Sequence, residues 1–241
     1  MVTPTSASNE TVLELRFRPN ALVLDHRGAW AENLSAHMSL PEWQIVENRL
    51  DIYSTDKTHH LFVGFRNAGM AYANTPSTTF FAEKAQRFLR RLFSLEDFGD
   101  PLHIERLGVR HKLAIPTQTS FIDLVEHFAS EYVQLSASLK DAFGGATLID
   151  IGAPLNYKDG LGFFNTSAGP MQEAQFKDFF RKKEGLPATG LYIDVDYWVK
   201  PEETLSSSDV ISKVHQFTTA AQQRATTIRQ LALAEPSGKA S

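Results

Sequence analysis

Asp194 and Asp196 lie two residues apart in the largely apolar segment GLYIDVDYWVK (190–200). Alternate residues of a strand share a face, so both carboxylates would lie on one face, roughly 7 Å apart along the strand. Two carboxylates so placed can share a divalent cation if a third oxygen ligand joins them, and Asp150 of LIDIG is the candidate. On this interpretation the chain would be a cation-dependent enzyme that acts on a phosphate-containing substrate.

The same aspartates also have an interpretation as paired charges on the polar face of a sheet. Arg106 and Arg110 alternate in the same way in IERLGVRHKLAIP (104–116), on the side away from the apolar residues. Opposite charges on adjacent strands contribute about 0.2–1 kcal/mol per pair. The chain has neither a calcium-binding loop after the aspartates nor a Gly-Lys-Ser/Thr phosphate loop. We favour paired charges and predict no metal, no cofactor and no assigned catalytic residue.

A third interpretation treats this polar face as a binding surface. Its candidate contact residues combine rings with cations: Arg18, Arg106, Arg110, Tyr192 and Trp198. Rings stack on bases and arginines contact phosphates, so the face suits a peptide, a nucleotide or single-stranded nucleic acid. The formal net charge of −4 counts against long nucleic acid.

The composition excludes several kinds of chemistry. The 241 residues are 42% hydrophobic and 22% charged, as in ordinary globular proteins. There is no cysteine, which excludes disulfides, cysteine-ligated zinc, iron–sulfur clusters and cysteine nucleophiles. His111 is in phase with apolar residues, so we expect it to be buried and hydrogen-bonded. Because the N-terminus lacks a signal-peptide pattern and no apolar run approaches ~20 residues, we expect a cytoplasmic protein without membrane contact.

Two hydrophobic periods divide the chain into strands and helices. The first half reads as strand 11–19, helix 28–38, strands within 43–55, 59–67 and 69–75 with a hairpin turn at 67–69, and helix 78–98. The second half reads as strand 103–116, helices 120–135 and 136–143, strands 146–157, 160–169 and 190–200, and helix 208–233. The apolar seam of the last helix is expected at Val210, Val214, Phe217, Ala221, Ile228 and Leu231.

Both halves follow the order strand, helix, three strands, helix, and LRFR (15–18) matches LGVR (107–110). We therefore expect an α+β fold in which a largely antiparallel, curved sheet carries its helices on one face. A duplicated β-α-β-β-β-α unit explains this order, and a single domain whose elements merely alternate is the alternative. The expected boundaries are a disordered N-terminus (1–10), a first half (11–100), a second half (101–233) with an insertion (171–189), and a disordered tail (234–241).

Two strands resemble those of a known family. IERLGVRHKLAIP (104–116) resembles the R-[IL]-G-[LV]-R central strand of a sporadically distributed, uncharacterised prokaryotic protein family of similar length. LYIDVDYWV (191–199) is similar to that family's L-x-[IL]-D-[IV]-D strand, which also precedes a long C-terminal helix. His111 and Lys112 depart from the pattern, where an aromatic residue and an asparagine are common. The resemblance implies this fold and a soluble prokaryotic protein, and it brings no established activity.

The favoured function is a non-enzymatic binding or regulatory protein that acts through the polar sheet face or the C-terminal helix. Its expected partner is another protein or a second copy of the chain. The cation-dependent enzyme built on Asp194 and Asp196 remains an alternative, as does an RNA-binding or RNA-processing module. The pattern leaves open whether the polar face is exposed, covered by the insertion (171–189) or buried in a dimer.

Overall fold

The computed structural model describes residues 6–96, 98 and 103–234. Its strands are β1 (Ser8–Phe17), β2 (Glu42–Val46), β3 (Arg49–Tyr53), β4 (His59–Gly64), β5 (Asn67–Ala73), β6 (Ile104–Pro116), β7 (Ala153–Lys158), β8 (Phe163–Gln172) and β9 (Thr189–Val199). Its helices are α1 (Leu22–Met38), α2 (Phe80–Phe93), α3 (Phe121–His127), the π-helix η1 (Phe128–Tyr132), α4 (Ala137–Ala142), α5 (Glu173–Phe179) and α6 (Ser207–Ala232).

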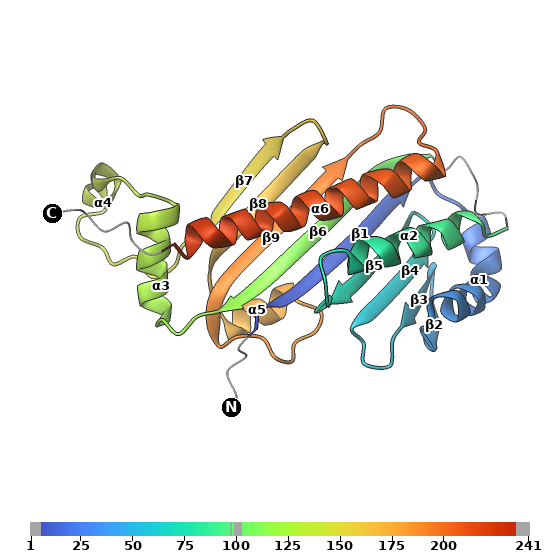
Figure 1. The fold of residues 1–241 in the computed structure, drawn as a ribbon, viewed down its shortest axis with the longest axis horizontal. Helices are drawn as coiled ribbons and strands as arrows, with labels where there is room; N and C mark the ends of the chain where they lie inside the picture. The colour runs from blue at the N-terminus through green and yellow to red at the C-terminus, as the bar shows by residue number, and fades with distance from the viewer. Residues whose placement is uncertain (1–5, 97, 99–102, 235–241) are drawn as a thin grey trace.

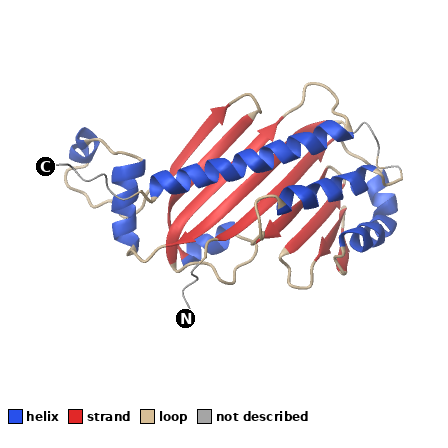
Figure 2. Ribbon diagram, in the orientation of Figure 1, coloured by secondary structure: helices blue, strands red, loops and turns tan. Residues whose placement is uncertain are grey.

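The strands in the described part of the chain form one open sheet in the order β2-β3-β4-β5-β1-β6-β9-β8-β7 (Figure 2). Every neighbouring pair runs antiparallel. The predicted α+β class with a largely antiparallel sheet is therefore confirmed. None of the described helices is long and apolar enough to cross a membrane.

The opening strands of the two halves, β1 and β6, pair at the middle of the sheet. In each half the last strand returns to pair with the first, since β5 lies beside β1 and β9 lies beside β6. The first half has one strand more than expected, because residues 43–55 fold as the hairpin of β2 and β3. The shared path of the chain is consistent with a duplication, which stays a prediction.

One face of the sheet, here called the helix side, is covered by α1, α2 and α6 (Figure 1). The predicted seam of α6 is buried as far as Ile228, whereas Leu231 is 57% exposed, so its inclusion in the seam was wrong. Ala232, four residues after Ile228, takes the buried position instead, and Leu231 lies off that line of the helix.

The other face, here called the open face, is crossed by residues 173–188, which we call the strap. The strap contains α5 and joins β8 to β9 (Figure 1). Phe176, Phe180 and Leu186 of the strap pack with Tyr192 in a second, small hydrophobic core. The strap lies within the segment expected as an insertion (171–189) and covers part of the polar face, and it begins at residue 173 because β8 extends to Gln172. That the segment is an insertion stays a prediction.

Three sequence-based boundaries need correction. Residues 8–10 belong to β1 and not to a disordered N-terminus; residues 1–5 and 235–241 lie outside the described residues. The hairpin between β4 and β5 turns at residues 65–66, and Gly69 lies within β5. A Cβ on Gly69 would lie 2.1 Å from the Leu13 carbonyl oxygen, so this glycine permits close approach of β1 and does not form a turn. Residues 146–152 form no strand, and β7 begins at Ala153.

Candidate functional site

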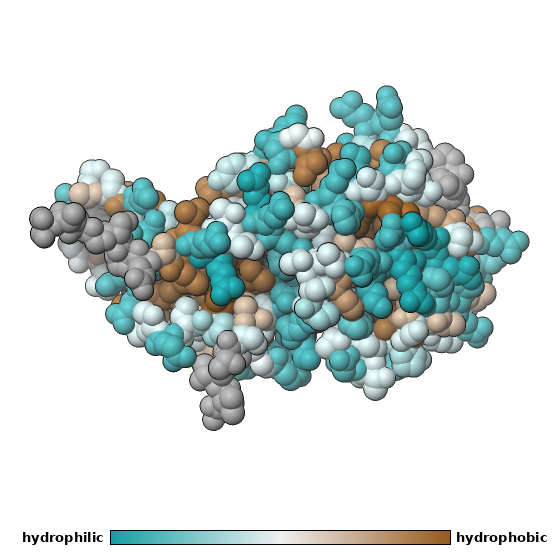
Figure 3. All heavy atoms as spheres, viewed as in Figure 1, coloured by the Kyte–Doolittle hydropathy of each residue, from teal (hydrophilic) through white to brown (hydrophobic). Residues whose placement is uncertain are grey.

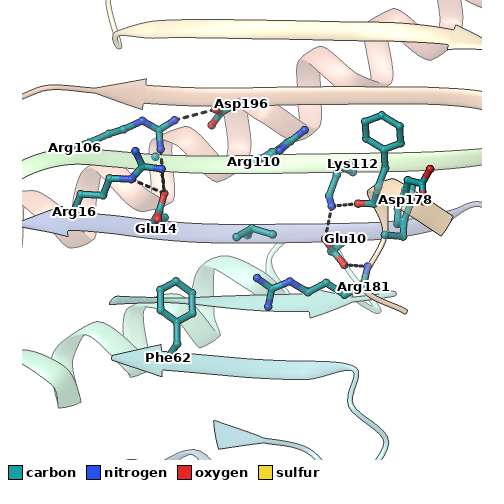
Figure 4. Close-up of a pocket in the computed structure, with 14 residues that line it drawn as sticks. Glu10, Glu14, Arg16, Phe62, Arg106, Arg110, Lys112, Asp178, Arg181 and Asp196 are labelled. Carbon is teal, nitrogen blue, oxygen red and sulfur yellow. Dashed lines mark hydrogen bonds and ion pairs between the residues drawn. The ribbon is translucent and has the colours of Figure 1, made fainter. Parts of the chain in front are cut away.

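The open face carries a hollow of about 450 Å³ beside the strap (Figure 4). Val12 of β1 and Gly108 of β6 form its floor, where side chains are small. Phe62 of β4 and Phe179 of the strap supply apolar walls, and the remaining lining is mostly charged. The hollow is thus a mixed surface in which ionic groups surround a narrow apolar floor.

Diagonal ion pairs run along one side of the hollow. Strand register places Arg110 directly opposite Asp196. The guanidinium of Arg110 instead reaches Asp194, with Nε 2.8 Å from Oδ1, and Arg106 Nη2 lies 2.9 Å from Asp196 Oδ2. Gly108 makes room for this arrangement, because a Cβ there would lie 3.0 Å from Arg106 Nη1. The predicted pairing of acidic and basic strand residues is confirmed, displaced from direct register by two residues for Arg110 and by four for Arg106.

These contacts shift the pKa values of the paired groups. The hydrogen bonds that Arg110 donates to Asp194 raise the pKa of the guanidinium, which stays cationic. Burial raises the pKa of Asp196, against the opposing influence of Arg106 and Arg110. The carboxylates are therefore occupied by arginine and are not free oxygen ligands.

A second ionic group anchors the strap to the sheet. Lys112 of β6 forms an ion pair with Glu10 of β1 and donates to the backbone carbonyl of Phe179. The backbone N–H of Arg181 donates to Glu10 Oε2 at 2.9 Å. Burial lowers the pKa of Lys112, although Glu10 opposes this shift. The pair is almost completely enclosed, with Glu10 1% and Lys112 6% exposed.

The side chain of Arg181 extends from the strap toward β4. Its guanidinium contacts Nδ1 of His60, whose Nε2 lies 2.7 Å from Asp51 Oδ1. A guanidinium only donates, so Nδ1 is the acceptor and Nε2 carries the hydrogen. Burial lowers the pKa of His60 despite the bond to Asp51, which favours this neutral form. Within the described residues, no carboxylate forms an ion pair with Arg181.

Next to the hollow, two rings form what we call the aromatic platform. Phe163 of β8 and Trp198 of β9 stack with ring centroids 4.7 Å apart and planes at 16°. Arg106 lies 5.7 Å and Lys200 5.9 Å from the Trp198 ring, and Lys158 lies 5.2 Å from the Phe163 ring. Stacked rings with nearby cations are a surface on which a nucleobase can bind.

The structure brings together several of the residues singled out in the sequence. Arg106, Arg110 and Asp196 line the hollow, and Asp194 joins them through Arg110. Trp198 belongs to the aromatic platform.

Three other candidates lie elsewhere. Tyr192 is 1% exposed beneath the strap, where Phe176 and Phe180 contact its ring, so it is not a surface contact residue. Arg18 follows the end of β1, with its backbone N–H bonded to His103, and does not line the hollow. Asp150 is exposed in the segment before β7, and no three His, Asp or Glu side chains in the described ranges gather to hold a metal ion.

Sequence reasoning missed several contributors, among them Glu10, Phe62, Phe163 and Arg181. Glu10 is in phase with the polar residues of β1, so alternation alone could have placed it on this face. Phe62 and Arg181 are far apart in the chain, and only the docked strap brings them to one hollow. Phe176, Phe179 and Phe180 have helical spacing, which was the available signal that the strap packs on something.

Comparison with known proteins adds no assignment. No protein-family model matches the chain, and the curated proteins contain no detectable relative. The resemblance to the sporadically distributed prokaryotic family therefore stays a prediction.

Proposed function

We propose that the protein is a non-enzymatic binding protein that holds an acidic segment of a partner protein in the hollow on its open face. The observation that carries this proposal is the Arg181 guanidinium, which borders the hollow with a neutral histidine as its contact. Guanidinium groups form paired, charge-assisted hydrogen bonds with carboxylates. A carboxylate of the partner would supply the charge that His60 does not.

The other walls favour an apolar side chain beside that carboxylate. Phe179 is 42% exposed, and together with Phe62 it borders the hollow. Arg110 keeps 44% of its side chain exposed while it holds Asp194, so it offers a second donor group at the rim. An Asp or Glu next to a Phe or Leu fits these walls.

The other binding element expected from the sequence, α6, is less suited. Its apolar seam is buried against β6 and β9. The alternative cation-dependent chemistry is also less favoured, because Asp194 and Asp196 are each engaged by arginine and Asp150 joins no ligand group with them. A cation would have to displace both arginines from partly buried positions.

Fluorescence anisotropy with two labelled peptides tests the proposal. We expect Gly-Ser-Phe-Glu-Asp-Gly to bind and its uncharged counterpart Gly-Ser-Phe-Gln-Asn-Gly to bind at least tenfold more weakly. Arg181→Ala should weaken binding of the acidic peptide by about 10-fold to 100-fold, since a hydrogen bond to a charged group contributes about 1.5–3 kcal/mol.

Lys183→Ala is the matched control, because Lys183 is another exposed cation of the strap that does not line the hollow. The substitution should leave the affinity unchanged. Equal binding of the two peptides, or equal loss in both variants, would refute an acidic ligand held by Arg181.

A second candidate, single-stranded RNA, is favoured by the aromatic platform alone. Stacking of one base contributes about 1–3 kcal/mol, so Trp198→Ala should weaken binding of a labelled ten-nucleotide oligouridylate about fivefold or more. Arg181→Ala should leave that affinity nearly unchanged, because Arg181 is not among the cations beside the platform. No measurable RNA binding at low salt would remove this candidate.

A further inference from the structure

A second hollow, of about 360 Å³, lies on the helix side, where the end of α1 meets the polar face of α2. We call it the arginine recess, because Arg87, Arg90 and Arg91 of α2 line it together with His37 of α1. Figure 3 shows hydrophilic surface gathered over α2. The recess therefore lies on the face of the sheet opposite to the first hollow and is separate from it.

The three guanidiniums of the recess have only neutral partners. Arg87 donates to the backbone carbonyl of His37, and Arg91 Nε donates to Asn33 Oδ1, 2.5 Å away. Arg90 is exposed. Within the part of the chain that the structure describes, none of the three arginines forms an ion pair with a carboxylate. The recess thus holds three cations that no group of the protein neutralises by direct contact.

The charge of the recess is unbalanced as a whole. Glu83 is the carboxylate that also lines it, so the lining has a formal net charge of +2, whereas the whole chain has −4. Arg87 and Arg91 are four residues apart on one helix, and like charges at this spacing destabilise the helix. A bound anion would offset this repulsion.

Support of the α1 C-terminus accounts for one of these arginines and not for all three. The carbonyls of residues 35 and 36 accept hydrogen bonds from the backbone N–H groups that follow the helix, and Arg87 caps the carbonyl of His37. Arg90 caps no carbonyl in the described ranges, although it lies in the same recess. Its position is explained better by a ligand than by the helix end.

We propose that the arginine recess binds a phosphate monoester. At neutral pH this group carries nearly two negative charges and presents three acceptor oxygens, which matches a net charge of +2 and three guanidiniums. Guanidiniums form paired, charge-assisted hydrogen bonds with phosphate. A carboxylate would bring one charge and two oxygens, and would leave part of the cluster unbalanced. Free metabolites and phosphorylated serine side chains both present this group.

Fluorescence anisotropy with a labelled Gly-Gly-phosphoserine-Gly-Gly peptide tests the proposal. We expect this peptide to bind and its unphosphorylated counterpart to bind at least about tenfold more weakly, since charge-assisted hydrogen bonds to phosphate are lost. Arg90→Ala should weaken binding of the phosphopeptide by about tenfold or more for the same reason. Glu83→Gln should strengthen it, because the substitution removes the opposing charge.

Two arginine variants are the controls. Arg229→Ala removes an exposed arginine of α6 that does not line the recess, and it should leave the affinity unchanged. Arg181→Ala removes the arginine of the first hollow and should also leave it unchanged. Competition with free phosphoserine separates the two sources of the phosphate. Displacement at a concentration near the dissociation constant of the peptide indicates a free metabolite, whereas a need for much more indicates a phosphorylated protein segment.

His37 provides a readout inside the recess. Burial lowers the pKa of its ring, and the neighbouring Arg87 and Arg91 lower it further; Arg90 and Glu83 are the other charged groups of α2 that line the recess. A bound dianion opposes the arginines, so phosphoserine should raise this pKa. Titration of the ring signals by nuclear magnetic resonance, with and without phosphoserine, measures the change.

Four results would overturn the proposal. One is equal binding of the two peptides, and another is an equal loss in Arg90→Ala and Arg229→Ala, which would indicate attraction by general surface charge. A loss in Arg181→Ala would place the phosphate in the first hollow. The fourth is binding that leaves the pKa of His37 unchanged.

Discussion

His111 and Lys112 are adjacent in β6, are each 6% exposed, and point to opposite faces of the sheet. On the helix side, His111 is among apolar residues and shares a 2.8 Å hydrogen bond with Thr11 of β1. On the open face, Lys112 is paired with Glu10 of the same neighbouring strand. Equal burial thus accommodates a neutral ring on one face and a full charge on the other. The partner offered by β1, and not the degree of burial, decides which is tolerated.

The largest effect should come from removing the buried charge on the open face. Lys112→Met should lower the free energy of unfolding by about 3–5 kcal/mol, because it leaves Glu10 buried without its ion pair. Chemical denaturation with urea measures this. The double variant Glu10→Gln/Lys112→Met should recover much of the loss, and Lys183→Met, at an exposed position, should change little. A loss below about 1 kcal/mol in Lys112→Met would show that the two faces do not differ as described.

A smaller loss is expected from the strap that covers Lys112. Phe180 is 5% exposed in the small core beside Tyr192, whereas its neighbour Phe179 is 42% exposed. Phe180→Ala should therefore lower the free energy of unfolding by about 3 kcal/mol, and Phe179→Ala by less than about 1 kcal/mol. Similar losses in the two variants would contradict the docked position of the strap.

On the helix side, burial of His111 should make the stability of the protein depend on pH. Burial lowers the pKa of His111 from 6.5 to about 4, with Asp194 opposing the shift. The unfolded chain therefore takes up a proton at this histidine below pH 6.5, while the folded chain does not until near pH 4. The contribution to stability is complete above pH 6.5 and declines by about 1.4 kcal/mol per pH unit below it, or about 2 kcal/mol at pH 5.

Urea denaturation at pH 7.5 and pH 5 checks this contribution. In His111→Gln the loss of stability between the two pH values should be smaller than in the unsubstituted chain by about 2 kcal/mol. The control is His127→Gln, since His127 is a partly exposed histidine of α3, and this variant should keep the original pH dependence. An unchanged pH dependence in His111→Gln would mean that the helix side admits the charged ring.

In β1 and α2, hydrophobic periodicity was sufficient to predict which residues are buried. The alternation in β1 predicted Leu13, Leu15 and Phe17 on one face, and all three are fully buried. The 3.6-residue period of α2 predicted its apolar stripe, and the residues of that stripe from Phe81 to Leu92 are buried. In these elements a single local period determines the outcome, because one face meets the core and the other meets solvent.

Periodicity did not reveal what covers the polar face. It placed Tyr192 and Asp194 on one side of β9, but the strap packs over Tyr192, and its docking depends on contacts between distant segments. The same limit applies to Arg181, whose place beside the hollow follows from two contacts of the strap with the sheet, at Glu10 of β1 and His60 of β4. The face of the sheet on which a residue lies follows from its neighbours in sequence, whereas the distant segment that packs over it does not.

The central position of β1 has a consequence for how the chain folds. Leu13 pairs with Met70 on one side and with Val109 on the other, so both ladders of the strand join residues far apart in sequence. During synthesis β1 emerges well before either neighbouring strand. One edge of β1 has no partner until β5 is made, and the other has none until β6 is made. Pairings of such long sequence separation slow folding, which for comparable sheets takes about milliseconds to seconds. An incomplete chain released before β6 is made would have no partner strand on one side of β1, and such an unpaired strand edge promotes misfolding and aggregation.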